Sequence, residues 1–182
     1  MSVHSFGQEA WSAVDKARVS VAWFLGCSPR EIIFTSGATE SNNLAIKGAV
    51  RSFCSQKDKH FLKPHIITTQ FEHHCVLNTC QKLEKEGLAE VTYLSVSREG
   101  IVSPQEVKKA IQPNTILISV MYVNNEIGTE QPIGEIGEIV KKENEIRAKD
   151  GRWKIVFHTD ATQAVNYFNC NVERLGVDLV SF

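Results

Sequence analysis

The spacing of apolar residues alternates along the chain between a helical period and short continuous runs. In residues 8–25 apolar side chains recur at every third or fourth position, and Gly26 follows as a suitable C-cap. The apolar positions are Ala10, Val14, Ala17, Val21 and Leu25. This pattern predicts a first amphipathic helix.

Further along the chain, short apolar runs alternate with amphipathic segments. The runs, which we interpret as strands, are residues 31–35, 65–69, 91–96, 116–123, 154–158 and 177–182. Helices are predicted at residues 40–53, 75–86, 104–111 and 133–149. Such alternation is typical of βαβ units. We therefore predict an α/β fold with three α/β/α layers and a mostly parallel sheet. The last run ends with the sequence, so we expect an incomplete domain.

Two polar segments punctuate this pattern. Ser103 and Glu106 have the spacing of a capping box, and Pro104 between them suits the first helical position. Residues 55–63 are mostly polar and predict an exposed loop.

Composition and charge exclude several classes of protein. The 182 residues are 42% hydrophobic and 23% charged, with a formal net charge of -1. This balance gives no electrostatic reason to expect nucleic acid or an acidic membrane as a partner. No apolar window reaches the length of a transmembrane helix, and the first residues lack the features of a secretory signal. We predict a cytoplasmic protein.

The cysteines give no metal-binding or disulfide pattern. They are Cys27, Cys54, Cys75, Cys80 and Cys170, an odd number with no C-x-x-C pair. We expect free, mostly buried thiols.

Polar residues follow four of the predicted strands. They are residues 36–39, 72–74, 124–126 and 160–163. In open α/β sheets, ligands bind beyond the carboxyl ends of the strands. Polar groups that converge there, next to apolar strand interiors, predict a cofactor site.

The residues before the second helix suit a phosphate group. Small residues at Gly37 and Ala38 let backbone N–H groups approach an anion at a helix N-terminus, and Thr39 adds a hydroxyl donor. A simple turn capped by Ser36 or Thr39 is the alternative.

Other candidates suit a flat cofactor ring. Asp160 can hold a cationic ring nitrogen such as that of pyridoxal phosphate (PLP), or it can cap the following turn. Gln163 and Asn125 can donate to a phenolate oxygen, or they can satisfy backbone groups of their loops.

The histidines allow several interpretations. His73 can stack on a ring or move protons. The run of His73, His74 and Cys75, with Cys80 beyond, suggests a metal, but no second cluster has matching spacing, so we expect none. His158 lies inside a predicted strand and is expected to be a core residue.

Four segments together carry a resemblance to a known family. They are FTSGATESNN at residues 34–43, EH at 72–73, VNNEIG at 123–128 and HTDATQ at 158–163. They strongly resemble the bacterial cysteine desulfurases, which belong to the aspartate-aminotransferase-like PLP enzymes. The similarity runs from about residue 4 to residue 182. It implies that residues 1–182 form part of the large PLP-binding domain, without the N-terminal arm and the C-terminal part that includes the small domain.

The resemblance implies roles for individual residues. Ala38 and Thr39 match the phosphate-binding pair. His73 matches the histidine that stacks on the cofactor ring and assists proton transfer. Asn125 matches a residue near the substrate and the phenolic oxygen of the cofactor.

The resemblance implies two further roles, and the sequence departs from the family in three respects. Asp160 matches the partner of the pyridine nitrogen, and Gln163 matches the partner of the phenolic oxygen. The family's Schiff-base lysine follows a segment like residues 178–182, and its persulfide-forming cysteine lies farther on. Neither is present in this sequence, and residues 56–63 look longer than in many members.

The implied reaction converts L-cysteine to L-alanine and a protein-bound persulfide for iron–sulfur clusters or tRNA thiolation. The implied partners are a sulfur acceptor or iron–sulfur scaffold protein, and a second copy of the chain in a homodimer. A selenocysteine lyase of the same fold and a truncated remnant without activity are the alternatives.

Overall fold

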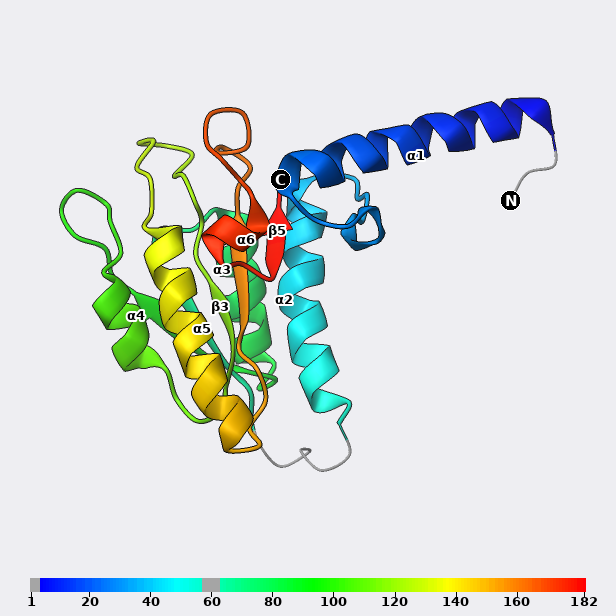
Figure 1. Ribbon diagram of the computed structural model, residues 1–182. Coiled ribbons are helices and arrows are strands. Elements are labelled where there is room, and N and C mark those ends of the chain that lie inside the picture. The colour runs from blue at the N-terminus through cyan, green and yellow to red at the C-terminus, as the bar shows by residue number, and fades with distance from the viewer. Residues whose placement is uncertain (1–3, 57–62) are drawn as a thin grey trace.

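Five parallel strands form the sheet of the computed structural model, which describes residues 4–56 and 63–182 (Figure 1). The strands are β1 (His65–Thr69), β2 (Glu90–Leu94), β3 (Thr115–Ser119), β4 (Val156–Asp160) and β5 (Leu179–Ser181). Their order in the sheet is β2-β1-β3-β4-β5. The helices are α1 (Ser5–Leu25), the 3₁₀ helix η1 (Pro29–Glu31), α2 (Ala38–Cys54), α3 (His74–Lys85), α4 (Pro104–Ala110), α5 (Ile133–Lys149) and α6 (Val172–Leu175).

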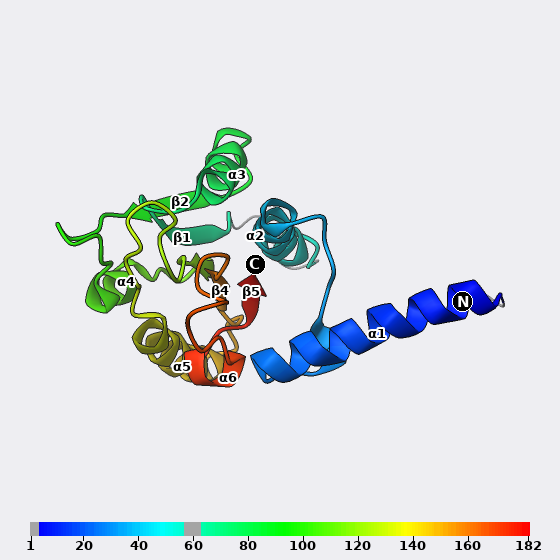
Figure 2. The same ribbon diagram turned by 90° about the horizontal axis from the view of Figure 1, so that it is seen from above.

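Helices cover both faces of the sheet, as the sequence predicts. α2 and α3 pack together on one face, and α4 and α5 pack together on the other (Figure 2). The predicted α/β class and three-layer arrangement are therefore confirmed. Because all the strands are parallel, their carboxyl ends lie at one edge of the sheet.

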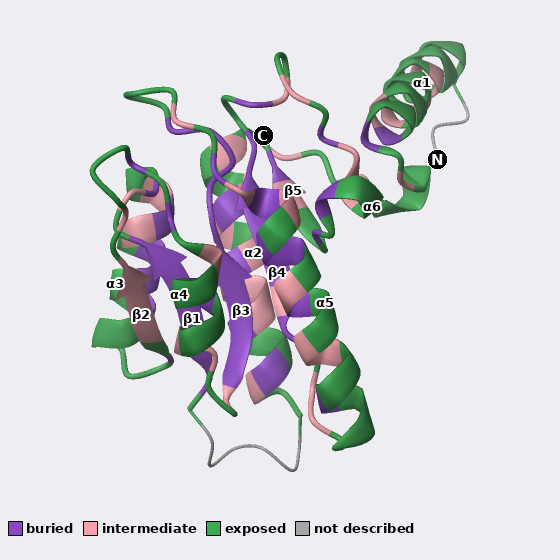
Figure 3. Cartoon of the chain, turned by 60° about the vertical axis from the view of Figure 1, so that its left-hand side comes forward, coloured by how far each residue is buried: buried purple, intermediate pink, exposed green. Residues whose placement is uncertain are grey.

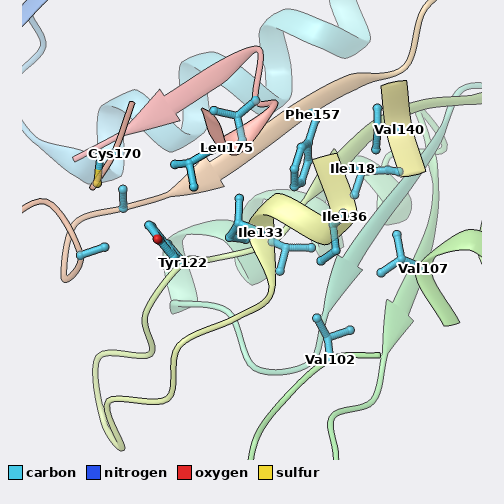
Figure 4. Close-up of a cluster of buried hydrophobic side chains, with 14 of the residues drawn as sticks. Val102, Val107, Ile118, Tyr122, Ile133, Ile136, Val140, Phe157, Cys170 and Leu175 are labelled. Carbon is cyan, nitrogen blue, oxygen red and sulfur yellow. The ribbon is translucent and has the colours of Figure 1, made fainter. Parts of the chain in front are cut away.

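Each face of the sheet has its own buried cluster, because neighbouring residues of a strand point to opposite sides. Ile66 and Leu117 pack beneath α2 and α3, whereas Ile67 and Ile118 pack against α4 and α5. Figure 4 shows the second cluster, in which Ile133, Ile136 and Val140 of α5 meet Phe157 of β4. The central strands are buried on both sides, which explains why their sequences are continuous apolar runs.

The predicted strand at residues 31–35 is wrong. η1 occupies the start of this segment, and residues 32–35 form no strand pairing in the described structure. Ile33 and Phe34 are 69% and 49% exposed, so the apolar run lies at the surface. The run has the composition of a strand, but no neighbouring strand offers it hydrogen bonds.

The capping box is also misplaced. Ser103 precedes α4 and Pro104 takes the first helical position as predicted, but the Ser103 side chain makes no capping hydrogen bond. The capping box lies instead at η1, where Ser28 accepts from the backbone and the Glu31 carboxylate accepts from the Ser28 N–H at 2.6 Å. The same residue types therefore cap a short turn that the apolar pattern did not reveal.

Smaller differences concern the thiols and the polar loop. All five cysteines are free, but only Cys80 and Cys170 are fully buried. Most of the loop predicted at residues 55–63 lies outside the described residues. No helix in residues 4–56 or 63–182 is long and apolar enough to cross a membrane.

Helix α1 extends away from the sheet (Figure 1), and most of its length is exposed (Figure 3). Only Ala22 and Leu25 of this helix are buried, whereas Trp23 is 85% exposed and Trp11 is 59% exposed. Exposed apolar surface of this kind promotes association.

We expect the protein to associate through α1. Trp11→Gln with Trp23→Gln should shift the oligomer toward monomer and lower binding of a hydrophobic dye, because both changes remove exposed apolar surface. Size-exclusion chromatography with light scattering measures the first effect. Glu9→Gln with Lys16→Gln on the same helix is the matched control. A wild-type protein that is already monomeric and binds no dye contradicts the expectation.

Candidate active site

A cavity of about 530 Å³ opens at the carboxyl ends of the strands. The order of the strands reverses between β1 and β3, and this is where ligands bind in open parallel sheets. The cavity is lined by all six residues proposed from the sequence, which are Ala38, Thr39, His73, Asn125, Asp160 and Gln163. The fold thus brings together residues from four separate segments.

The N-terminus of α2 forms one wall of the cavity. Gly37 is the N-cap and has φ 151°, a backbone conformation that residues other than glycine rarely adopt. It supplies no capping side chain, and the first N–H groups of a helix have no acceptor within the helix. The alternative, in which Ser36 caps the helix, is not realised, because the Ser36 N–H and hydroxyl donate to Glu40. The wall therefore presents backbone donors suited to an anion.

Asp160 is the last residue of β4 and is only 5% exposed. Its Oδ1 accepts from the Thr162 N–H at 3.0 Å and from the Thr162 hydroxyl at 2.6 Å, as the capping alternative expects. Its Oδ2 accepts from Asn42 Nδ2 at 2.7 Å. No lysine or arginine of the described residues forms an ion pair with it. A buried carboxylate that lines a cavity without a cationic partner fits a cationic ring nitrogen.

His73 is the N-cap of α3. Its Nδ1 accepts from the Cys75 backbone N–H at 3.2 Å and lies 3.0 Å from Cys75 Sγ. Because Nδ1 accepts a backbone donor, the neutral imidazole carries its proton on Nε2. The capping contact therefore fixes both the ring and its tautomer at the edge of the cavity.

Asn125 belongs to the loop after β3. The neighbouring Asn124 holds this loop, because its Oδ1 accepts from the Glu126 and Ile127 N–H groups at 2.9 and 3.0 Å. The Asn124 side chain also donates to Phe71 O at 3.0 Å. The side chain that satisfies the backbone groups of this loop is therefore that of Asn124, and Asn125 lines the cavity.

Several cavity residues were missed by sequence reasoning. Cys75, Met121, Val123 and Thr162 also line the cavity, and Asn42 lies behind it against Asp160. Position relative to the predicted strand ends gives a signal for two of them, because Thr162 lies inside the polar segment 160–163 and Cys75 directly follows the segment 72–74. Asn42 lies one turn before Ile46 on the buried face of its helix, so the helical period gives a signal for its burial but none for its polar partners.

His158 is a core residue, as predicted. It is fully buried, and its Nδ1 and Nε2 lie 2.9 and 3.0 Å from the hydroxyl oxygens of Ser119 and Ser181. Burial lowers its pKa to about 4, which keeps the ring neutral. The side chain bridges β3, β4 and β5 below the cavity.

In the described part of the chain, no group of three or more His, Cys, Asp or Glu side chains could hold a metal ion.

Glu72 joins the ends of β1 and β3 next to His73. Its Oε1 accepts from the Met121 N–H at 2.8 Å and the Thr69 hydroxyl at 3.0 Å, and its Oε2 has no hydrogen-bond partner among the described residues. Burial raises the pKa of this carboxyl to about 8, against the opposing effect of the two donors. The side chain is therefore largely protonated at neutral pH.

Glu72 should make stability fall as pH rises. Its folded pKa lies above the unfolded value, so its contribution is full below about pH 4.5 and is lost between about pH 4.5 and 8. Glu72→Gln imitates the protonated form and should match the wild type near pH 5. At pH 8 its melting temperature should be several degrees higher. Thermal melts of the wild type and the variant between pH 5 and pH 8 test this prediction. An equal difference in melting temperature at both ends of the range would contradict it.

Comparisons with known proteins agree with this geometry. The family model described as aminotransferase class-V matches residues 1–182. A cysteine desulfurase of Homo sapiens is 50% identical over 178 residues, which are 98% of this chain and 35% of that protein. The cysteine desulfurase IscS of Glaesserella parasuis is 53% identical over 98% of this chain and 40% of that protein. The chain thus spans well under half the length of these relatives.

A solved structure has the same arrangement. The protein SspA, in its complex with cysteine, aligns with a TM-score of 0.86 and 42% sequence identity. The alignment covers 99% of this chain and 48% of that one.

Proposed function

The chain belongs to the aminotransferase class-V family, and we propose that it supplies part of the large cofactor-binding domain of a PLP-dependent cysteine desulfurase. The family is PLP-dependent. The observation that carries the proposal is the cavity lined by a helix N-terminus, a histidine and a buried carboxylate without a cationic partner. We propose that the N-terminal arm and the small domain lie outside residues 1–182.

The donor set fits PLP. The backbone N–H groups at Ala38 and Thr39, with the Thr39 hydroxyl, would bind the phosphate. Gln163 and Asn125 would donate to the phenolic oxygen. When bound, PLP supplies an electron sink for negative charge at the substrate α-carbon.

Two residues would act on protons and the ring. The Asp160 carboxylate would hold the proton on the pyridine nitrogen, because a buried anion stabilises a neighbouring cation. His73 would lie against the ring and move a proton at its Nε2, since Nδ1 is occupied by the α3 cap.

We propose L-cysteine as the substrate. An enzyme thiolate attacks the substrate sulfur, a sulfur–sulfur bond forms, the carbon–sulfur bond breaks, and the α-amino acid gains a proton to become L-alanine. Lys47, Lys141 and Lys154 do not line the cavity. Because the resemblance matches neither the Schiff-base lysine nor the attacking cysteine to a residue of this chain, both would lie outside residues 1–182.

The partners proposed are a sulfur-acceptor or iron–sulfur scaffold protein, which would accept the persulfide, and a second copy of the chain in a homodimer. The exposed apolar face of α1 supports association. The cytoplasmic location stays a prediction.

Two assays test the function. The complete protein loaded with PLP should release one alanine per persulfide formed from L-cysteine, with selenocysteine measured in parallel. Residues 1–182 treated with PLP and borohydride should give no stoichiometric lysine adduct. Absence of alanine from the loaded complete protein, or desulfurase activity with a labelled lysine in residues 1–182 alone, would overturn the proposal.

A further inference from the structure

Asn42 is a fully buried polar residue of α2, one turn after the proposed phosphate site. Its Nδ2 lies 2.7 Å from Asp160 Oδ2 and 3.2 Å from Cys75 Sγ. Its Oδ1 has no hydrogen-bond partner among the described residues. Both hydrogen bonds of the Asn42 amide are therefore made by its N–H₂ group, and its carbonyl oxygen accepts none.

The Asp160 carboxylate is held on both oxygens. Three donors reach it, namely the Thr162 N–H, the Thr162 hydroxyl and Asn42 Nδ2. A carboxylate has about four lone-pair sites, so about one acceptor site remains for a donor in the cavity. Fixed in this way, the carboxylate cannot turn to offer a different oxygen without losing a hydrogen bond.

Cys75 connects Asn42 to His73. Its Sγ accepts from Asn42 Nδ2 and lies 3.0 Å from His73 Nδ1. Burial raises the pKa of the Cys75 thiol, so the thiol keeps its proton near neutrality and can donate it to Nδ1. The thiol thus adds to the backbone N–H that already keeps the His73 proton on Nε2.

The unpaired Oδ1 distinguishes this arrangement from ordinary packing. A buried carbonyl without a donor destabilises the fold, and such groups in native structures often mark functional sites. If the amide were turned around, Oδ1 would face the Asp160 carboxylate and the two acceptors would repel. The contact with Asp160 is therefore what decides the orientation of the amide.

We propose that Asn42 is a positioning residue whose amide holds the Asp160 carboxylate and, through the Cys75 thiol, the His73 ring. The effect of Asn42 on catalysis rests on the proposed function, because Asp160 and His73 are the groups expected to face the PLP ring. The hydrogen bonds themselves exist without the cofactor and can be tested without it.

The first experiment uses the complete protein without PLP. With ¹⁵N-asparagine labelling, the side-chain N–H signals of Asn42 should shift downfield and exchange slowly with solvent. They should move when Asp160 is replaced by Asn, whereas those of Asn43 should not. Asn43 is the matched control, because it lies on the same helix and bonds to Thr39 O and Thr79 instead. Asn42 signals unaffected by Asp160→Asn would overturn the proposal, whatever the protein binds.

The second experiment uses PLP labelled with ¹⁵N at the ring nitrogen. Asn42→Leu should weaken PLP binding about 10-fold, shift the ring-nitrogen signal and lower kcat about 10-fold with little change in KM. Asn43→Leu should change each quantity less than about twofold. Should Asn42→Leu fold poorly, Asn42→Ser is expected to fold and give the same losses, because its shorter side chain does not reach Asp160.

The outcomes separate the two proposals. Unchanged PLP affinity and ring-nitrogen signal in a folded Asn42 variant would make Asn42 a structural contact only, and the inference would be wrong. Failure of the wild-type protein to bind PLP would instead refute the proposed function, and the cofactor-free spectra would still decide whether Asn42 holds Asp160.

Discussion

Replacement of Asp160 by Asn in the PLP-loaded complete protein is expected to lower the rate of alanine formation by about 10²–10³-fold. The charge of this carboxylate is what would keep the ring nitrogen protonated, and loss of one well-placed electrostatic group commonly costs a factor of this size. Asn has nearly the same volume as Asp, so the cavity should keep its shape. The measurement is single-turnover cleavage of L-cysteine, with the absorption spectrum of the bound cofactor recorded in parallel.

Asp160→Ala should give a loss at least as large and should also weaken PLP binding. Asp150→Ala is a suitable control, because Asp150 is an exposed carboxylate whose ion pair with Arg152 lies far from the cavity residues. It should leave rate and spectrum unchanged. Wild-type rates in both Asp160 variants would refute the proposed role of Asp160 and leave its buried carboxylate without an explanation.

The candidate site could be predicted from the sequence because the topology of a parallel sheet gathers strand ends. Residues 72–74 follow a real strand, β1, and residues 160–163 begin at the last residue of another, β4. Their polar character contrasts with the apolar interiors of these strands. Residues 36–39 reached the site although the strand predicted before them does not exist. Their placement depends on α2, whose N-terminus points to the same edge of the sheet.

What the sequence did not reveal depends on contacts between distant segments. The apolar run at residues 31–35 is indistinguishable by composition from a buried strand, and only the absence of a neighbouring strand sets it apart. Asn42 and Arg147 are polar residues on the buried faces of α2 and α5, in line with the apolar residues of those helices. The helical period points both side chains inward, but their acceptors are supplied by remote parts of the chain, which no local period encodes.

Arg147 is the second residue whose replacement should have a large effect. It lies in the last turn of α5 and is 0% exposed. Its guanidinium donates to Thr115 O at 2.8 Å and Gln112 O at 2.7 Å, and to Glu143 Oε1 at 2.9 Å. The hydrogen bonds to the two carbonyls hold the backbone where the chain enters β3. This end of the strand is opposite to the end that faces the cavity.

Arg147→Met is expected to lower the free energy of unfolding by about 3–5 kcal/mol. The two carbonyls would lose their donors inside the protein, and a buried polar group without a partner is costly. Chemical denaturation with the wild type in parallel measures the loss. Lys142→Met on the exposed side of the same helix should change stability by less than about 0.5 kcal/mol.

Glu143→Gln separates the ion pair from the carbonyl contacts of Arg147. Gln can still accept from the guanidinium, and the Glu143 side chain is 23% exposed, so this change should cost only about 1 kcal/mol. Because Arg147 lies far from the cavity residues, Arg147→Met should reduce the melting temperature while kcat below the transition stays within about twofold. A loss in Glu143→Gln as large as in Arg147→Met would show that the ion pair, rather than the strand entry, carries the stabilisation.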